Sequence, residues 1–389
     1  MKVDLVKASL FPFFIAFYLF GTGGSCLAAS PSMLDAKKEA DTAGYIFEAS
    51  RDEIIARAKK EGKLKVFSGL GAETTLKDLS SRFKVRYPFV SEIQTAERSP
   101  GTEAAQRFLL EVKAGLAKGW DAITLRTDLR GEYASHLKKF DILGMARHGV
   151  LNMPVQLIDS KNRNVVAITS ELHVVGYNKR LTPADKLPSQ WEDFLKPGYK
   201  GKKLYADIRP LVLSSLIPVW GLEKTLDFAR KIAAQEPIWI RGNPRGLTAV
   251  AAGERALFMG PYFGSLKVQQ KKAANMDLEY KVIEPVPARL NEENGILAAS
   301  EHSYTALLWL EFLVSPEAQK VIDQYEPGEA SLFAPGSIQS DVIRGKKVST
   351  MQWEDPEKLE AWLKDLVKAY LFPTAVAKSN FDSRRDRNQ

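Results

Sequence analysis

The stretch VVGYNKRLTPADKLPSQWEDFLKPGYKGKKLYADIR, residues 174–209, decides the fold of this chain. It opens with an apolar, β-branched run, Val174–Tyr177, which is typical of a strand. A polar middle follows, broken by Pro197 and two glycines. The stretch closes with a second strand, Leu204–Ala206, that ends at Asp207. Two strands separated by a short helical segment indicate an α/β protein.

The same alternation extends on both sides of this stretch. Short apolar runs alternate with segments whose apolar residues recur at helical spacing. The runs predicted as strands are Leu64–Phe67, Val90–Ala96, Asp121–Leu125, Val165–Thr169, Leu172–Tyr177, Ile238–Ile240, Ala256–Met259 and Gly295–Ala298. Ser189 with Glu192 predicts a capping box, and Asn243 before Pro244 predicts another helix start. The pattern predicts open, mostly parallel sheets flanked by helices.

The first 29 residues have the layout of a secretory signal peptide. Lys2 and Lys7 precede an apolar run, Ala8–Phe20, and small residues lead to Ala29. The run is shorter than the roughly 20 residues that span a bilayer, although a buried N-terminal helix or a membrane anchor is the alternative. We expect export to the periplasm. Lipid attachment at Cys26, the only cysteine, is an open alternative to simple cleavage.

Length and charge narrow the classes of protein further. A chain of 389 residues can form two domains, each with its own core. The formal net charge is +8, but basic and acidic residues are interleaved almost everywhere, and only the tail segment 384–387 is a compact basic cluster. A nucleic-acid-binding surface is therefore not indicated. Removal of Cys26 with the leader would leave no cysteine for a disulfide or a metal site.

Two blocks of residues resemble a known family. The first block consists of Tyr177, Asn178, Trp191, Asp193, Pro197, Lys200, Gly201, Lys202 and Asp207. The second is the run Leu310–Gln319, LEFLVSPEAQ. Both resemble the bacterial extracellular solute-binding proteins of ABC importers, in particular the iron(III)-type branch. The resemblance implies a two-lobed, type II periplasmic-binding-protein fold, in which residues 174–209 cross from the first lobe into the second.

The resemblance also implies a division of the chain. After the signal peptide, residues 1–29, we expect an N-terminal helical segment at 30–61. The first lobe would comprise residues 62–173 and 289–340, the second lobe residues 178–284, and a C-terminal helix and tail residues 341–389. Hinge strands are expected near Leu172–Tyr177 and Ile283–Ala288. Such a protein closes on its ligand by hinge bending.

Candidate binding residues follow the predicted strands, because ligands of open α/β sheets bind beyond the carboxyl ends of strands, where helices begin. They are Ser68, Gly69, Arg98, Ser99, Asp207, Arg209, Arg241, Asn243 and Tyr262. Arginine recurs in this set, and its planar donors suit carboxylate, phosphonate or phosphate. Several arginines at one cleft would be uncompensated without an anion. We therefore expect an anionic ligand, or a metal carried with an anion.

Iron(III) is the alternative ligand. The resembled branch typically uses two adjacent tyrosines, and this chain has Tyr262 followed by Phe263, which has no donor atom. Tyr262 could still bind the metal, with Glu97, His173 or Asp207 as further ligands. Phe263 could either pack in the core or cover the ligand.

We therefore interpret the chain as a monomeric periplasmic binding protein that delivers a small solute to an ABC permease in the inner membrane. No cofactor is expected. Rival interpretations are a ligand-sensing module and an enzyme on the same scaffold. A nucleophile elbow is unsupported, because the chain has no Gly-x-Ser-x-Gly. Asp207 and Glu97 could form an acid–base pair, but nothing in the sequence sets their separation.

Overall fold

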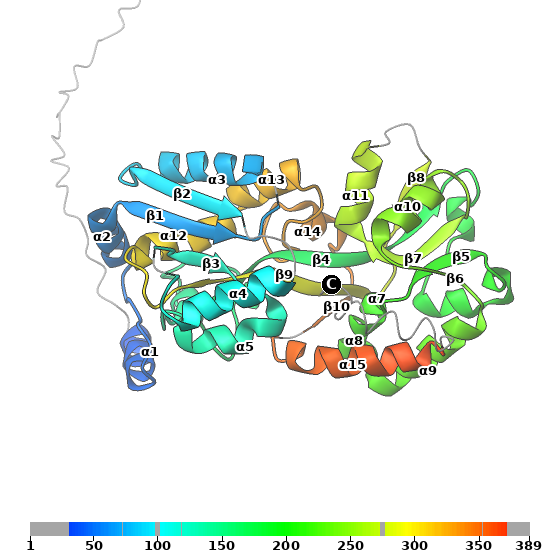
Figure 1. Ribbon diagram of the computed structural model, residues 1–389, viewed down its shortest axis with the longest axis horizontal. Helices are drawn as coiled ribbons and strands as arrows, with labels where there is room; N and C mark the ends of the chain where they lie inside the picture. Colours follow the sequence, from blue (N-terminus) through cyan, green and yellow to red (C-terminus); the bar gives the residue numbers. More distant parts are fainter. Residues whose placement is uncertain are drawn as a thin grey trace, which may run out of the picture.

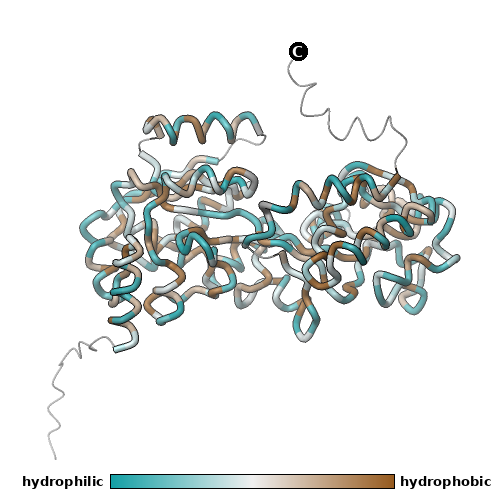
Figure 2. Tube along the Cα trace, turned by 90° about the horizontal axis from the view of Figure 1, so that it is seen from below, coloured by the Kyte–Doolittle hydropathy of each residue, from teal (hydrophilic) through white to brown (hydrophobic). Residues whose placement is uncertain are grey.

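The computed structural model describes residues 31–71, 73–97, 102–117, 119–272, 277–351 and 353–371. The predicted signal peptide and the candidates Arg98 and Ser99 lie outside these residues. Two lobes stand side by side and are joined through the long strands β4 and β9 (Figure 1). Viewed from below, the lobes meet at a narrower waist (Figure 2). The two-lobed α/β fold predicted from the sequence is confirmed.

The strands form one continuous path through both lobes, in the order β2-β1-β3-β9-β4-β7-β5-β6, with β8 beside β4 and β10 beside β9. Their bounds are β1 Lys63–Ser68, β2 Glu92–Glu97, β3 Ala122–Thr124, β4 Val165–Asn178, β5 Leu204–Asp207, β6 Ile238–Ile240, β7 Leu257–Tyr262, β8 Leu278–Lys281, β9 Val286–Ile296 and β10 Val348–Thr350. In each lobe the outer strands pair in parallel, β1 with β2 and β3, and β5 with β6 and β7. The central strands β4 and β9 pair antiparallel.

Helices cover both faces of the sheets (Figure 1). In the first lobe and at the waist they are α1 Pro31–Thr42, α2 Arg51–Glu61, α3 Glu73–Arg86, α4 Thr102–Lys113, α5 Arg130–Tyr133, α6 Ile142–Arg147, α12 Ser303–Leu313, α13 Pro316–Tyr325 and α14 Ile338–Val342. In the second lobe they are α7 Leu211–Ser214, α8 Ile217–Trp220, α9 Leu222–Ala234, α10 Asn243–Ala251, α11 Phe263–Lys272 and α15 Pro356–Ala369. Among the described helices none is long and apolar enough to cross a membrane.

The strands β4 and β9 are longer than the sequence predicted. The runs Val165–Thr169 and Leu172–Tyr177 are one strand, and Gly295 lies near the end of a strand that begins at Val286. The polar residues inside these strands, such as Glu171, interrupted the apolar pattern used for the prediction. They are tolerated because partners on the neighbouring strand satisfy their charges.

Each lobe has its own apolar core. Helix α12 lies in the middle of the first core, where Trp309 is fully buried and contacts Phe83 edge-to-face. In the second lobe, Trp191 is fully buried in the core that contains Leu213 and Ile232. This arrangement matches the sequence-based expectation that a chain of this length forms two cores.

Two predicted helix starts need correction by one residue. The 3-10 helix Trp191–Leu195 is capped at Gln190, and its carboxylate partner is Asp193 rather than Glu192. Asp193 Oδ2 accepts a hydrogen bond from the Ser189 backbone N–H at 2.8 Å, so a side chain still caps the backbone N–H groups before the helix, as predicted for a capping box. Helix α10 includes Asn243, and its N-cap is Gly242.

The C-terminal helix α15 packs on the second lobe. It contacts α9 and α7, and Leu366 and Tyr370 are buried in the core around Trp191. The residues just before the helix instead contact the first lobe, where Trp353 Nε1 donates to Gln156 O at 3.2 Å. The segment 353–370 therefore bridges the two lobes on the side of α7 and α9 (Figure 1).

Candidate functional site

Charged side chains meet where β4 and β9 pass from one lobe to the other. Glu171 of β4 lies directly opposite Arg289 of β9, and the two form an ion pair. Their side chains are only 16% and 27% exposed. Burial is the largest influence on the Glu171 carboxyl and opposes its charge, but Arg289, with smaller contributions from His173 and Tyr262, holds its pKa below the ordinary value. Both groups are therefore charged at neutral pH.

His173 and Tyr262 continue the same face of the sheet. Alternate residues of a strand share a face, so His173 lies on the side of Glu171. It is opposite Tyr262 of β7, with 4.7 Å between the ring centroids. Arg289 Nη2 donates to the Tyr262 hydroxyl at 3.2 Å. We refer to Glu171, His173, Tyr262 and Arg289 as the hinge cluster.

Burial decides the protonation of the two rings in the hinge cluster. It lowers the pKa of His173 to about 4, and Nδ1 lies 2.8 Å from Gly260 O, so the neutral ring donates there. Burial, and then the nearby charge of Glu171, raise the pKa of the Tyr262 phenol above its ordinary value. At neutral pH the cluster thus offers one ion pair, a phenol and an imidazole whose Nε2 is an acceptor.

Asp207 and Arg209 extend the site into the second lobe. Asp207 ends β5 and accepts hydrogen bonds from the backbone N–H of Arg209 at 2.9 Å and of Gly242 at 3.1 Å. It also pairs with the Arg209 guanidinium at 2.9 Å. Backbone donors that could have held a solute anion are therefore bonded to this carboxylate. Arg209 Nη1 makes no hydrogen bond within the described chain, and the side chain is 44% exposed.

The other predicted binding residues lie farther apart in the fold. Ser68 is buried at the end of β1, where its hydroxyl accepts from Leu70 N at 3.1 Å. Gly69 N donates to Thr124 Oγ1 at 2.9 Å. A Cβ on Gly69 would lie only 1.8 Å from Glu292 Oε2. The absence of a side chain at Gly69 therefore lets the Glu292 carboxylate lie against the backbone here. Asn243 is buried, whereas Arg241 is exposed.

Phe263 does not cover a ligand. It is fully buried in the second lobe, and its ring meets Tyr280 edge-on at 5.0 Å. Of the two alternatives left open by the sequence, core packing is the one observed. Within the described ranges no three His, Cys, Asp or Glu side chains are placed to hold a metal ion. Tyr262 as an iron ligand remains a prediction, and its phenol is hydrogen-bonded to Arg289.

Carboxylates crowd around Glu329, in the loop after α13. Burial is the main cause that raises the pKa of Glu329, to about 8. The negative charges of nearby carboxylates add to this effect, from Glu171, Glu326, Glu292 and Asp323. A Cβ at Gly264 would lie 1.9 Å from Glu329 Oε1, so the carboxyl also lies close to the start of α11. At neutral pH Glu329 therefore holds a proton in the folded protein.

This protonation predicts a pH dependence of stability. In the unfolded chain Glu329 titrates near about 4.3, so between that pH and about 8 only the folded state keeps the proton. The free energy of unfolding should fall as pH rises through this window and level off above it. Glu329→Gln, which cannot ionise, should flatten the dependence. Calorimetric melting at pH 5, 6.5 and 8 tests this, with exposed Glu317→Gln as control. An equal change of Tm with pH in wild type and in Glu329→Gln would contradict the prediction.

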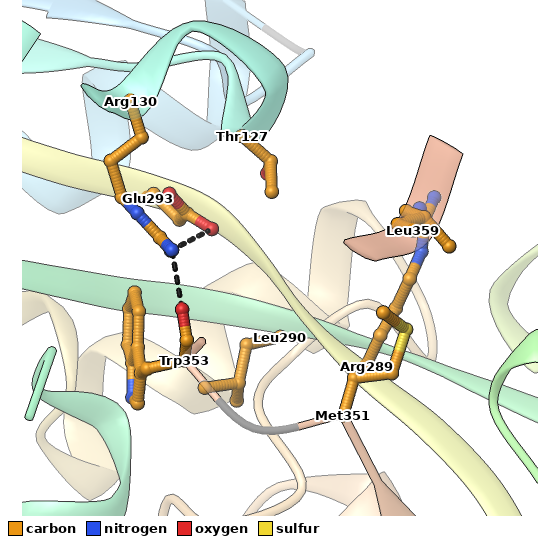
Figure 3. A pocket seen from close by; sticks show the side chains of 8 residues that line it. All are labelled: Thr127, Arg130, Arg289, Leu290, Glu293, Met351, Trp353 and Leu359. Atoms are coloured by element: carbon orange, nitrogen blue, oxygen red, sulfur yellow. Dashed lines mark hydrogen bonds and ion pairs between the residues drawn. The ribbon is translucent and has the colours of Figure 1, made fainter. Parts of the chain in front are cut away.

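A small cavity lies next to the hinge cluster, between the first lobe and the C-terminal segment (Figure 3). Its volume is about 30 Å³. The lining residues are Thr127, Arg130, Arg289, Leu290, Glu293, Met351, Trp353 and Leu359. The binding residues predicted from the sequence did not include Arg130, Glu293 or Trp353. The signal that could have found Glu293 is the polar run Asn291–Asn294, which is unusual inside a buried strand.

Comparisons with known proteins agree with this architecture. Residues 135–358, more than half of the chain, match the sequence profile of a family described as bacterial extracellular solute-binding protein. A comparison with curated proteins gives no match. Similar solved structures include ferric iron-binding protein A of Mannheimia haemolytica in an open conformation, with a TM-score of 0.62 and 19% identity over 80% of this chain and 99% of that one.

Two further structures show the same likeness. The Trichodesmium protein IdiA (FutA), in complex with iron and citrate ligands, has a TM-score of 0.59 and 19% identity, covering 79% of this chain and 99% of that one. The substrate-binding protein of an ABC transporter from Agrobacterium tumefaciens has a TM-score of 0.53 and 14% identity, covering 78% and 95%. At these identities the likeness shows a shared fold.

Proposed function

The chain belongs to the family of bacterial extracellular solute-binding proteins, and from that premise we propose that it captures one small solute between its lobes and delivers it to the permease of an ABC importer. The observation that carries the proposal is the pair of strands β4 and β9, which run through both lobes and place the hinge cluster at their crossing. Because few segments connect the two separate cores, the lobes can close on a ligand by hinge bending.

We propose that the protein works in the periplasm as a monomer, either after removal of residues 1–29 or anchored by a lipid on Cys26. The lobes would comprise residues 62–173 with 289–340, and residues 178–284. We assign α15 to the second lobe, because Leu366 and Tyr370 are buried there. These boundaries put the hinge at the middle of β4 and at the start of β9.

We propose further that the solute bears an anionic group, or is a metal–anion complex, held at the edge of the second lobe. Arg209 keeps the unused donor Nη1 at this position, although Asp207 already compensates its charge. Arg209→Ala should weaken binding of the solute by about 1.5 kcal/mol, roughly tenfold, the lower end for hydrogen bonds to charged groups, because the side chain is partly exposed. Isothermal titration of both proteins measures this, and equal affinities would remove the anionic group from the proposal.

A thermal-shift screen of the protein without its leader tests the function as a whole. Specific binding to the folded state raises the apparent Tm by mass action. The screen covers iron(III) with citrate or carbonate, small carboxylates, phosphonates, phosphate esters and compounds that combine an amine with an acid. A shift and colour with iron(III) alone would favour the iron alternative through Tyr262. A shift with an organic or phosphorus anion would place the protein in a different substrate class.

A further inference from the structure

We propose that the cavity beside the hinge cluster binds a protonated amino group of the solute, with Glu293 as its counter-charge and Trp353 of the C-terminal segment as its wall. The proposal rests on the function proposed above and adds to it, because a solute with an anionic group at Arg209 would then be a zwitterion. The supporting observations are the size of the cavity, the charges around it, and a buried acceptor atom with no donor.

The size of the cavity suits an ammonium head and not a larger charged group. Its volume of about 30 Å³ is enough for one or two atoms the size of a water oxygen. A phosphate, or a carboxylate with its carbon, needs more room. Arg130, Glu293 and Trp353 lie together on one side, and Arg289, Met351 and Leu359 lie together on the other (Figure 3).

Two guanidiniums, Arg130 and Arg289, and one carboxylate, Glu293, line the cavity, and further carboxylates pair with the arginines from outside the lining. Arg130 pairs with Glu293 at 3.1 Å and lies 3.8 Å from Asp159, and both carboxylates are almost fully buried. Arg289 pairs with Glu171. Both arginines are thus compensated internally, so no anion is needed to neutralise them. A positive group in the cavity would instead balance the remaining carboxylate.

Glu293 has an acceptor oxygen that lacks a partner. The residue is 2% exposed, Oε1 accepts from Arg130, and Oε2 makes no hydrogen bond within the described chain. Burial raises the pKa of Glu293, against the lowering influence of Arg130 and of the Thr127 side chain, which also lines the cavity. Buried acceptors that lack donors are costly, and an ammonium group supplies up to three donors.

The C-terminal segment closes this site from outside. The Arg130 guanidinium lies 5.1 Å from the centre of the Trp353 ring and also donates to Trp353 O. Ser160 donates to Glu354 Oε1 at 2.5 Å, which holds the same segment on the first lobe. Met351, Trp353 and Leu359 make part of the lining apolar, and electrostatic attraction between an ammonium group and Glu293 is stronger beside apolar side chains than in water.

Methylammonium chloride, the smallest probe with the required head group, tests the proposal. The Tm of the full chain without its leader is followed at pH 7.5 with increasing methylammonium chloride and, in parallel, with sodium chloride at the same ionic strength. We expect a larger Tm increase with methylammonium. In Glu293→Gln the concentration needed for the same shift should rise about tenfold or more, whereas exposed Glu317→Gln should behave as wild type.

A second variant keeps the test decisive if Glu293→Gln folds poorly. Leu359→Phe leaves Glu293 in place but should fill the cavity, and we expect it to abolish the methylammonium effect as well. Equal responses to methylammonium and sodium in wild type, or an unchanged methylammonium response in both variants, would overturn the proposal. A solute from the screen that binds wild type and Glu293→Gln equally would also overturn it, while leaving the solute-binding function intact.

Discussion

Replacing Trp191 by alanine is expected to lower the free energy of unfolding by about 3–5 kcal/mol, the range for removing a buried tryptophan. Trp191 is fully buried in the second lobe, beside Phe194. Its Nε1 donates to Pro285 O at 2.9 Å, at the entrance to β9. The substitution therefore leaves a large cavity and also removes the donor from a carbonyl near the hinge.

Urea denaturation of the wild type and Trp191→Ala, followed by far-ultraviolet circular dichroism, measures this loss. Trp191→Phe is the matched control, because it keeps an aromatic ring in the core and should cost clearly less. We expect the loss to appear in the unfolding of the second lobe, since Trp191 has its core contacts there. A change below about 1 kcal/mol for Trp191→Ala would show that the surrounding side chains collapse into the space.

Replacing Arg289 by methionine is expected to cost about 3 kcal/mol, the lower end of the range for breaking a buried ion pair. Methionine keeps an unbranched apolar stem but has no charge and no hydrogen-bond donor, so the change mainly removes the guanidinium. It leaves Glu171 without its cation at the centre of the hinge and removes the donor to Tyr262. The pair is only partly buried, which is why the lower end of the range applies.

A double variant separates the two causes of this loss. Glu171→Gln combined with Arg289→Met should regain much of the stability, because no uncompensated charge then remains. Arg344→Met is the surface control: Arg344 pairs with Asp341, but the two side chains are 79% and 64% exposed. Its effect should stay below about 1 kcal/mol. Equal losses for Arg289→Met and Arg344→Met, or no recovery in the double variant, would contradict the role of the hinge pair.

Contacts made by two internal carboxylates limit where the solute can bind. Asp207 occupies the backbone N–H groups of Arg209 and Gly242, and Glu292 lies against Gly69. Internal carboxylates thus take positions where the sequence analysis expected an anion to bind. The prediction of an anionic ligand now depends on the remaining donor of Arg209. The amino-group subsite on Glu293 is an independent prediction.

The architecture could be predicted from local signals. Val174–Tyr177 and Leu204–Ala206 read as strands because β-branched and apolar residues fit a buried, pleated surface. Asn243 before Pro244 marked a helix start, and in the structure α10 begins at Asn243. These signals depend on neighbours within a few residues of each other. They can therefore be recognised without knowledge of the fold. The ends of elements are less certain by one or two residues, as the observed caps at Gln190 and Gly242 show.

The functional site depended on pairings that local patterns do not contain. Glu171 faces Arg289 across 118 positions of the chain, and Arg130 faces Glu293 across 163. In the sequence Glu171 only interrupted an apolar run, and Trp353 belonged to a C-terminal segment of unknown role. The register of β4 against β9, set by packing of two separate cores, brought these charges together. The sequence by itself determined two α/β lobes and their crossing, and tertiary structure decided which charges are already satisfied and which acceptors are left for a solute.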